Sequence, residues 1–265
     1  TLGATITRCH RSAAQAGDPC YLRFREAVTR GAVPFCCQGP DNGLTIEGGM
    51  TLGYEWLEQW ANAGAAPDHV VLQVGGGALA SAVMASLAEL SSNRAELVEL
   101  SAVADPGGTK RPCTEGGRAM VSNRRPVLHT VQTESAWPLK RAHQRLAPLA
   151  AERGIDEALR EAATHRGEYM WPWESEPRSI ASGILDDETY DWIAVCEGML
   201  RSVGRSLVVG KDTLGAAHEL ARRCGISASA TGSAGLAGAL ALRDIAALKP
   251  TDRVALIMSG MERGA

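Results

Sequence analysis

The sequence has few of the residues that mark metal sites, disulfide scaffolds or large aromatic clusters. Aromatic side chains make up 5% of the 265 residues, and phenylalanine occurs only twice. The seven cysteines are odd in number and form no Cys-x-x-Cys pair, so a disulfide framework is not expected. The six histidines show no His-Glu-x-x-His spacing, so the sequence gives no support for a zinc site.

Basic charge and long apolar runs are also scarce. The net charge is −3 with no basic stripe, which argues against nucleic acid as a partner. No apolar run approaches the ~20 residues of a membrane-spanning helix, and no apolar stretch follows a basic start as in a secretory signal. With 45% hydrophobic and 22% charged residues, the composition is that of a soluble globular enzyme, which we expect in the reducing cytoplasm without a membrane partner.

The segments that are present alternate between strand-like and helix-like patterns. Short apolar runs predict strands at residues 1–10, 32–36, 69–74, 98–103, 127–131, 190–195 and 253–258. Helical spacing predicts helices at residues 20–30, 51–62, 78–90, 137–153, 212–223 and after residue 234 as far as 248, with Thr51 as the N-cap of the second. This alternation favours an α/β fold, with a mostly parallel twisted sheet covered by helices on both faces in three layers.

A glycine turn between a predicted strand and a predicted helix is the strongest motif. Residues 74–79 read Val-Gly-Gly-Gly-Ala-Leu. Consecutive glycines let the backbone curl until several N–H groups converge, and the helix start adds positive partial charge, which together suit a phosphate. The spacing fits neither a dinucleotide-binding nor a Walker loop. Taken alone, the motif fits a phosphate site and a turn required only for packing about equally well.

Two further motifs carry less weight alone. Ser259 follows the last predicted strand, at the sheet edge where ligands bind in open α/β folds, although a turn serine is the simpler interpretation. Residues 47–51 read Glu-Gly-Gly-Met-Thr and precede Glu55, which could be merely a loop and a capped helix.

Taken in order, these segments resemble fold type II enzymes that depend on pyridoxal 5′-phosphate (PLP), the group of threonine synthase, threonine dehydratase and the tryptophan synthase β subunit. The order and the separations match over nearly the whole chain. The matching segments are residues 47–55 (the family's EGxxT…E helix start), 74–79 (its GGGGL phosphate loop, with Ala78 replacing the fourth glycine), 179–184 (its SIAxGI segment), 231–238 and 257–260.

The resemblance implies a cofactor, a fold and a set of site residues. It implies PLP, held in a fold type II large domain accompanied by a remnant of the small domain. The implied ligands are the backbone N–H groups of Gly75, Gly76, Gly77, Ala78 and Leu79 for the phosphate, the Ser259 hydroxyl for the pyridine nitrogen, and Thr231 near the place where some relatives carry Glu. A neutral hydroxyl leaves that nitrogen largely unprotonated, which suits α,β-elimination and replacement on amino acids.

The lysine that carries PLP as a Schiff base in this family has no counterpart here. The chain has only Lys110, Lys140, Lys211 and Lys249, none in the family's Ser-x-Lys-x-Arg or Phe-Lys-Asp-Arg context, and the Ser-x-Gly-Asn loop for the substrate carboxylate is also absent. We therefore expect a C-terminal fragment or split chain. Residues 1–45 would end the small N-terminal domain, 46–265 would form the large PLP-binding domain, and a missing N-terminal segment or companion chain would supply the catalytic lysine.

The predicted function is that of a PLP-dependent lyase or β/γ-replacement enzyme acting on a small amino acid, as a homodimer when complete. The alternative is a non-catalytic subunit or pseudoenzyme, which the missing lysine would explain, and a different phosphate-binding α/β protein is a third hypothesis. Three side features complete the predictions: Cys36 and Cys37 as buried packing, residues 171–173 as aromatic packing under a loop, and residues 94–125 as a solvated, arginine-containing loop.

Overall fold

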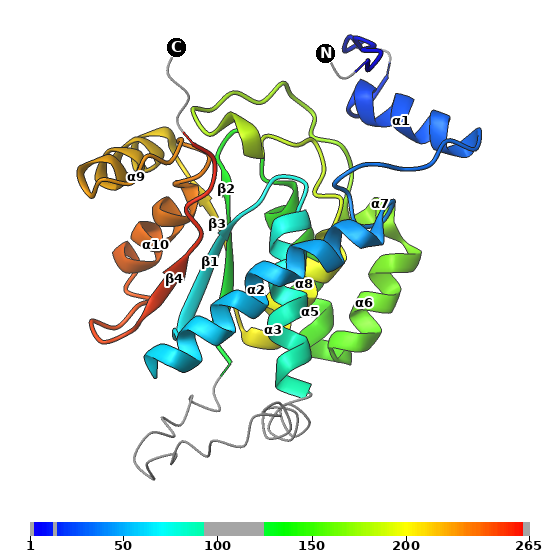
Figure 1. The fold of residues 1–265 in the computed structure, drawn as a ribbon. Helices are drawn as coiled ribbons and strands as arrows, with labels where there is room; N and C mark the ends of the chain where they lie inside the picture. Colours follow the sequence, from blue (N-terminus) through cyan, green and yellow to red (C-terminus); the bar gives the residue numbers. More distant parts are fainter. Residues whose placement is uncertain (1–2, 13–14, 93–124, 262–265) are drawn as a thin grey trace, which may run out of the picture.

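The computed structural model describes residues 3–12, 15–92 and 125–261. Within these residues, four parallel strands form one sheet in the order β3-β2-β1-β4. Their bounds are β1 (His69–Gln73), β2 (Val127–Thr133), β3 (Ser206–Val209) and β4 (Val254–Leu256). Since every pairing is parallel, all four carboxyl ends meet at one edge of the sheet, as Figure 1 shows.

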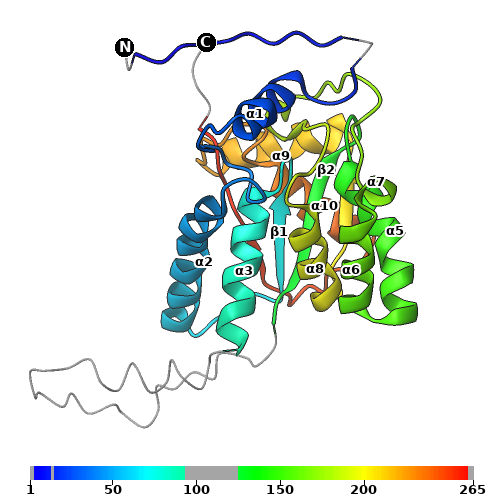
Figure 2. The same ribbon diagram turned by 90° about the vertical axis from the view of Figure 1, so that its right-hand side faces the viewer.

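Helices cover both faces of the sheet, so the predicted three-layer α/β architecture is confirmed (Figures 1 and 2). One face carries α9 (Lys211–Arg223) and α10 (Ala234–Asp244). The other carries α2 (Gly43–Ala63), α3 (Ala78–Ser92), α5 (Pro138–Arg153), α6 (Ile155–Thr164), α7 (Arg166–Tyr169) and α8 (Trp192–Ser202). Outside this body, α1 (Pro19–Thr29) and the short 3₁₀ turn η1 (Ser182–Ile184) belong to the edge near the strand ends.

Side chains of β1 alternate between the two cores. Val70 and Leu72 pack with α3, α5 and α8, whereas Val71 packs with α9 and α10. The period of two places successive side chains on opposite faces, and burial of both faces explains the unbroken apolar run of β1. The predicted strand at 69–74 therefore holds one central position in the sheet.

The predicted strand at residues 190–195 is wrong. Trp192 begins helix α8, which buries Trp192, Val195, Cys196 and Met199 on one side. That spacing of three and four residues is helical. The predicted window ended at residue 195 and did not include Met199, so its short apolar run resembled a strand. The true strand, β3, lies further on and was missed because it has only four residues.

Helix boundaries also differ from the predictions. Helix α2 begins at Gly43, so Thr51 is not an N-cap; its hydroxyl donates instead to the carbonyl of Gly48 within the helix, at 2.8 Å. Helix α10 ends at Asp244 rather than at 248, and α6 and α7 were not predicted. The loop predicted around residues 171–173 is present, with the Arg141 guanidinium stacked 3.6 Å from the centre of the Trp171 ring.

The described residues before α2 contain no strand, so the strands predicted at residues 1–10 and 32–36 are absent there. Val33 and Phe35 are exposed, and Pro34 has no amide hydrogen to offer a neighbouring strand. Cys36 is half-buried and Cys37 is exposed, so buried packing was the wrong interpretation for this pair. The predicted strand at 98–103 and the loop at 94–125 lie almost wholly outside the described residues, and the domain division at residue 45 stays a prediction.

No helix in the described ranges is both long and apolar enough to cross a membrane.

Candidate functional site

A pocket of about 290 Å³ opens at the carboxyl ends of the strands. Its wall brings together every residue that the sequence singled out as a site residue: Gly75, Gly76, Gly77, Ala78, Leu79, Thr231 and Ser259. The glycine turn comes from the end of β1, and Ser259 from the segment after β4, the neighbouring strand. Parallel pairing thus joins residues that are more than 180 positions apart in the sequence.

Outward hydrogen bonds hold the glycine turn in place. The carbonyl of Gly75 accepts from the Thr189 hydroxyl at 2.9 Å, and the carbonyl of Gly76 accepts from the Asp191 amide at 3.0 Å. Gly77 has φ +102°, which a residue with a side chain rarely adopts, and its carbonyl accepts from the Ser81 amide at 2.8 Å. With their carbonyls tied to the surroundings, the residues that open α3 have N–H groups available to an anion.

Ser259 is held by a side chain from β1. The Gln73 Nε2 amide donates to the Ser259 Oγ at 2.9 Å and to the Ile257 carbonyl at 3.2 Å. Because the Ser259 oxygen accepts this bond, its own hydrogen remains free to point at an acceptor. The arrangement prepares Ser259 as a hydrogen-bond donor, which suits an unprotonated ring nitrogen.

Thr231 joins two further segments of the wall. Its hydroxyl oxygen accepts from the Gly183 amide at 3.0 Å, and so connects the loop before α10 to η1. The next residue, Gly232, lies directly against the Ser259 backbone: a Cβ there would collide with the Ser259 carbonyl. Only glycine allows this approach, which brings Thr231 and Ser259 into the same pocket.

Two carboxyl groups line the pocket beside the glycine turn. Burial raises the pKa of Asp186 to about 6, against an opposing effect of the Gly76 backbone amide. Burial likewise raises the pKa of Asp191 to about 6, although the Gly39 amide donates to this carboxylate at 3.2 Å. Burial also raises the pKa of the Tyr190 phenol. Burial thus makes the charged form of each of these groups less favourable than it is in water.

Several residues that line the pocket were not predicted from the sequence. Gln73 could have been suspected, because it is the one polar residue late in the apolar run of β1. Asp186 and Asp191 belong to the segment after the SIAxGI-like motif, where an acidic loop normally indicates solvent exposure. Cys37, which also lines the pocket, carried no signal at all.

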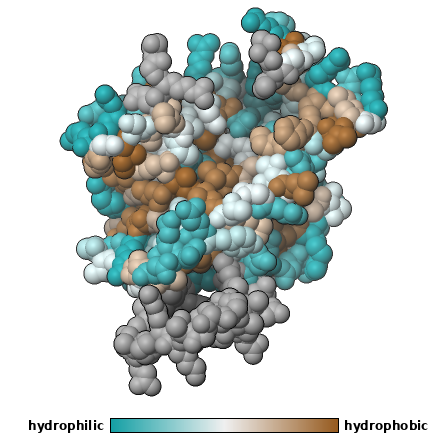
Figure 3. Space-filling view, in the orientation of Figure 1, coloured by the Kyte–Doolittle hydropathy of each residue, from teal (hydrophilic) through white to brown (hydrophobic). Residues whose placement is uncertain are grey.

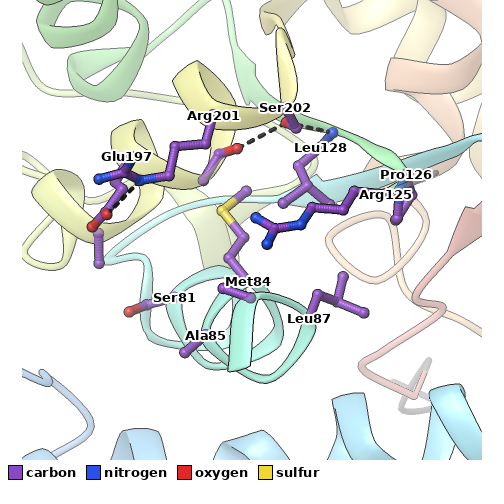
Figure 4. A pocket seen from close by; sticks show the side chains of 13 residues that line it. Ser81, Met84, Ala85, Leu87, Arg125, Pro126, Leu128, Glu197, Arg201 and Ser202 are labelled. Carbon is purple, nitrogen blue, oxygen red and sulfur yellow. Dashed lines mark hydrogen bonds and ion pairs between the residues drawn. The ribbon is translucent and has the colours of Figure 1, made fainter. Parts of the chain in front are cut away.

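A second and larger pocket, of about 430 Å³, lies between α3 and α8 toward the amino end of β2 (Figure 4). Its wall is mainly apolar, with Met84, Leu87 and Leu128, and Glu197 is paired with Arg201 at 2.7 Å. It contains none of the glycine-turn residues. No group of His, Cys, Asp or Glu in the described ranges could hold a metal ion.

Comparison with known families gives one match over almost the entire chain. Residues 1–260 match the family model described as pyridoxal-phosphate dependent enzyme. A search of curated proteins finds no match.

Solved structures of similar fold include three enzymes of different activity. A threonine deaminase from T.th. is 21% identical with a TM-score of 0.55, over 85% of this chain and 59% of that one. A pyridoxal 5′-phosphate-dependent aspartate racemase is 16% identical with a TM-score of 0.58, over 99% and 61%. Diaminopropionate ammonia lyase from Escherichia coli is 17% identical with a TM-score of 0.54, over 92% and 53%. The chain thus spans between half and two thirds of the length of these structures.

Proposed function

Because the chain belongs to the family of pyridoxal-phosphate dependent enzymes, we propose that it forms the phosphate- and ring-binding part of an enzyme that acts on a small amino acid. The observation that carries this proposal is the single pocket that unites the glycine turn with Ser259 and Thr231. PLP is the cofactor of the family, and the fit of this pocket to PLP can be argued from its two ends.

The phosphate end is the glycine turn. Backbone N–H groups of Gly75, Gly76, Gly77, Ala78 and Leu79 would bind the phosphate oxygens at the start of α3. A Cβ at Gly75 would collide with Asp186, and one at Gly77 would lie 3.0 Å from the Thr189 methyl group, so neighbouring side chains pack closely against the turn. A side chain at either position would displace the wall that shapes the anion site.

The ring end is Ser259. The Gln73 amide fixes the Ser259 oxygen, and the hydroxyl hydrogen would then be donated to the pyridine nitrogen. Bound PLP supplies an electron sink for bond-breaking at the substrate's α-carbon, and a neutral hydroxyl partner makes that sink weaker than a carboxylate partner would. This choice of partner supports elimination or replacement at the β or γ carbon, which we propose as the reaction class.

A racemase is the second candidate, since an aspartate racemase has a similar fold. Thr231 stands near the position where some relatives carry Glu, which favours a threonine-synthase-like or diverged branch over a simple dehydratase or racemase. Product analysis distinguishes the two: elimination releases ammonia and a keto acid, whereas racemisation returns the same amino acid with inverted configuration.

We further propose that the catalytic lysine comes from another segment or chain. Among the lysines in the described ranges, Lys140, Lys211 and Lys249 all lie outside the pocket wall. Among the described residues, strand β4 pairs with β1 alone, and its three residues are half-buried rather than buried. Figure 3, in the orientation of Figure 1, shows apolar residues gathered in the middle of the visible face, where Figure 1 shows β1 and β4. A missing segment that packs there would cover them and complete the site.

Titration with PLP, followed by borohydride reduction and peptide mapping, tests the proposal. We expect the chain to bind PLP more tightly than pyridoxal, which lacks the phosphate, and to yield no uniquely labelled lysine unless its missing segment is added. A failure to bind PLP would overturn the proposed function. Stoichiometric labelling of one lysine in this chain, with turnover, would overturn only the proposal that another segment or chain supplies the catalytic lysine. PLP binding without turnover in the completed assembly would favour a non-catalytic subunit.

A further inference from the structure

The pocket has an unusual charge for a phosphate site. A phosphate monoester has its second pKa near 6, so at pH 7 and above it is mostly a dianion. The polar or ionisable side chains that line the pocket are those of Cys37, Gln38, Gln73, Asp186, Tyr190, Asp191, Thr231 and Ser259. None of these is a cation, and two are carboxyl groups.

Asp186 is the carboxyl group nearest to the glycine turn. Its Oδ2 atom lies where a Cβ on Gly75 would project, and within 3.8 Å of the corresponding position on Gly76. The side chain is half-buried and interacts with the Gly76 backbone amide, one of the amides that the phosphate would use. A charged carboxylate at this position would repel a phosphate dianion directly.

Within the described residues, the surroundings of Asp186 do not supply a compensating positive charge. Burial raises its pKa most, and its charged neighbours, Asp18 at the N-cap of α1 and Asp187 in its own loop, raise it further. Three nearby cations are already paired: Arg11 with Asp187 at 2.9 Å, Arg25 with Asp41 at 3.2 Å, and Arg166 with Glu188. The remaining titratable groups that face the pocket are Cys37, Tyr190 and Asp191.

We propose that Asp186 takes up a proton when the phosphate group binds, and then donates its O–H to a phosphate oxygen. The proton moves from solvent to a carboxylate oxygen, and no covalent bond to the cofactor changes. Phosphate binding and protonation of Asp186 are therefore linked: each strengthens the other. This inference rests on the proposed function, because it concerns the same phosphate site.

Asp191 is less suited to this role, although it lies in the same wall. Its carboxylate accepts a hydrogen bond from the Gly39 amide at 3.2 Å, and a Cβ on Gly39 would collide with its other oxygen. Asp191 therefore holds the loop before α2 against the glycine turn. Asp186 has its oxygen directed at Gly75 and Gly76, where the phosphate oxygens would lie.

Calorimetric titration with PLP between pH 6.5 and 8.5 tests the proposal. In the native chain we expect the Kd to rise up to about tenfold per pH unit between pH 7 and 8, because one proton must be taken up with the ligand. Titrations at pH 7.5 in two buffers of different ionisation enthalpy should show uptake approaching one proton per PLP. In Asp186→Asn the Kd should lose the part of its pH dependence that comes from this one proton. Binding of PLP at pH 8 should be at least as tight as in the native chain.

Two controls keep the result specific. Glu58→Gln removes one negative charge at an exposed position of α2 outside the pocket wall, and should retain the native slope. Pyridoxal, which lacks the phosphate, should bind the native chain without the extra proton, a comparison that needs no variant to fold. Equal slopes and equal proton uptake in the native chain and Asp186→Asn would overturn this inference, whereas absence of PLP binding at every pH would instead overturn the proposed function.

Discussion

At the scale of single residues, the preparation of Ser259 is the feature most specific to a ring-binding role. A serine at a strand end is commonplace, but one whose oxygen already accepts from Gln73 has its hydrogen left for a ligand. The Gln73 side chain is buried in the core at the end of β1, so its position is set by packing. The fold therefore orients the donor before any ligand arrives.

Replacing Ser259 with alanine should weaken PLP binding about three- to tenfold, because one hydrogen bond to the ring nitrogen, worth roughly 0.5–1.5 kcal/mol, is lost. Fluorescence titration with PLP would measure the change. Ser175→Ala, which alters an exposed serine in another loop, is the matched control and should leave the affinity unchanged. Equal affinities for Ser259→Ala and Ser175→Ala would argue that the hydroxyl does not contact the cofactor.

Two histidines at the opposite end of the sheet form a directional hydrogen-bond chain. The Arg205 amide donates to His129 Nδ1 at 3.1 Å, so the His129 proton lies on Nε2, which is 3.0 Å from His69 Nδ1. His69 Nε2 then lies 3.2 Å from the Asp252 carboxylate. These hydrogen bonds cross the sheet in the strand order β3, β2, β1 and β4, and they connect the amino ends of the four strands.

The burial of His129 within this series of hydrogen bonds should make the free energy of unfolding depend on pH. Burial, together with the nearby charges of His69 and Arg205, lowers the pKa of His129 to about 4. Since the unfolded value is near 6.5, the unfolded chain binds the proton more readily, and stability is lost as the pH falls from 6.5 toward 4. We expect a loss of roughly 2–3 kcal/mol from this group, measured by urea unfolding. His129→Gln should flatten the profile in that window, whereas His165→Gln, at an exposed position, should not; parallel profiles for all three proteins would contradict the assignment.

At the scale of elements, the contact between α2 and α3 depends on glycines that face α3. A Cβ on Gly53 would collide with the Ser86 side chain, and one on Gly49 would lie 2.7 Å from the Ala82 Cβ. Gly48, on the same helix, would meet nothing within 4 Å. Close approach of α2 supports α3, whose first turn forms the phosphate end of the pocket.

This difference predicts opposite effects for the same substitution. Gly53→Ala should lower the free energy of unfolding by about 1–3 kcal/mol through overpacking. Gly48→Ala should raise it by about 0.5–1 kcal/mol, because alanine favours the helix and has free space there. Urea unfolding of both variants beside the native chain measures the effects, and a stabilising Gly53→Ala would show that the two helices are further apart than described.

The sequence predicted elements well where local pattern and tertiary role agree. The strand at residues 69–74 and the helices near 20–30, 137–153 and 212–223 have clear periods, and the structure contains them. Prediction failed at α8, because its first apolar residues fit the spacing of a strand as well as that of a helix until Met199 is included. It also failed at β3, because four residues are too few to show an alternating pattern. The strand predicted at 32–36 had an apolar pattern but has no partner strand within the described residues.

The site followed a similar division. Its backbone components could be predicted, because glycine runs and strand-end hydroxyls leave local signatures that a parallel sheet then brings together. Asp186 could not, because its role depends on burial and on neighbours that the fold supplies from far along the chain. For Gln73 the only signal in the sequence was that of a polar residue late in an apolar run. An acidic loop residue becomes a pocket residue only when residues 184–191 pack against the glycine turn.

At the scale of the whole molecule, binding of the cofactor in the proposed pocket should stabilise the folded chain. Ligand that binds the folded form alone raises the free energy of unfolding, by about 2.7 kcal/mol at a hundred times the Kd. PLP should therefore raise the Tm of this chain in a thermal unfolding experiment, and pyridoxal at the same concentration should raise it less. Equal shifts for the two compounds would show that the phosphate contributes nothing to binding.

In the proposed site, the amides of residues 75–79 bind the cofactor's phosphate while Ser259 contacts its ring. Amide-detected NMR during titration with PLP, and separately with pyridoxal, addresses both ends of the pocket at once. We expect the resonances of Gly75, Gly76 and Gly77 to shift with PLP and hardly to move with pyridoxal, whereas the Ser259 resonance should shift with both. Saturable PLP binding that leaves the three glycine resonances unmoved would contradict the proposed site.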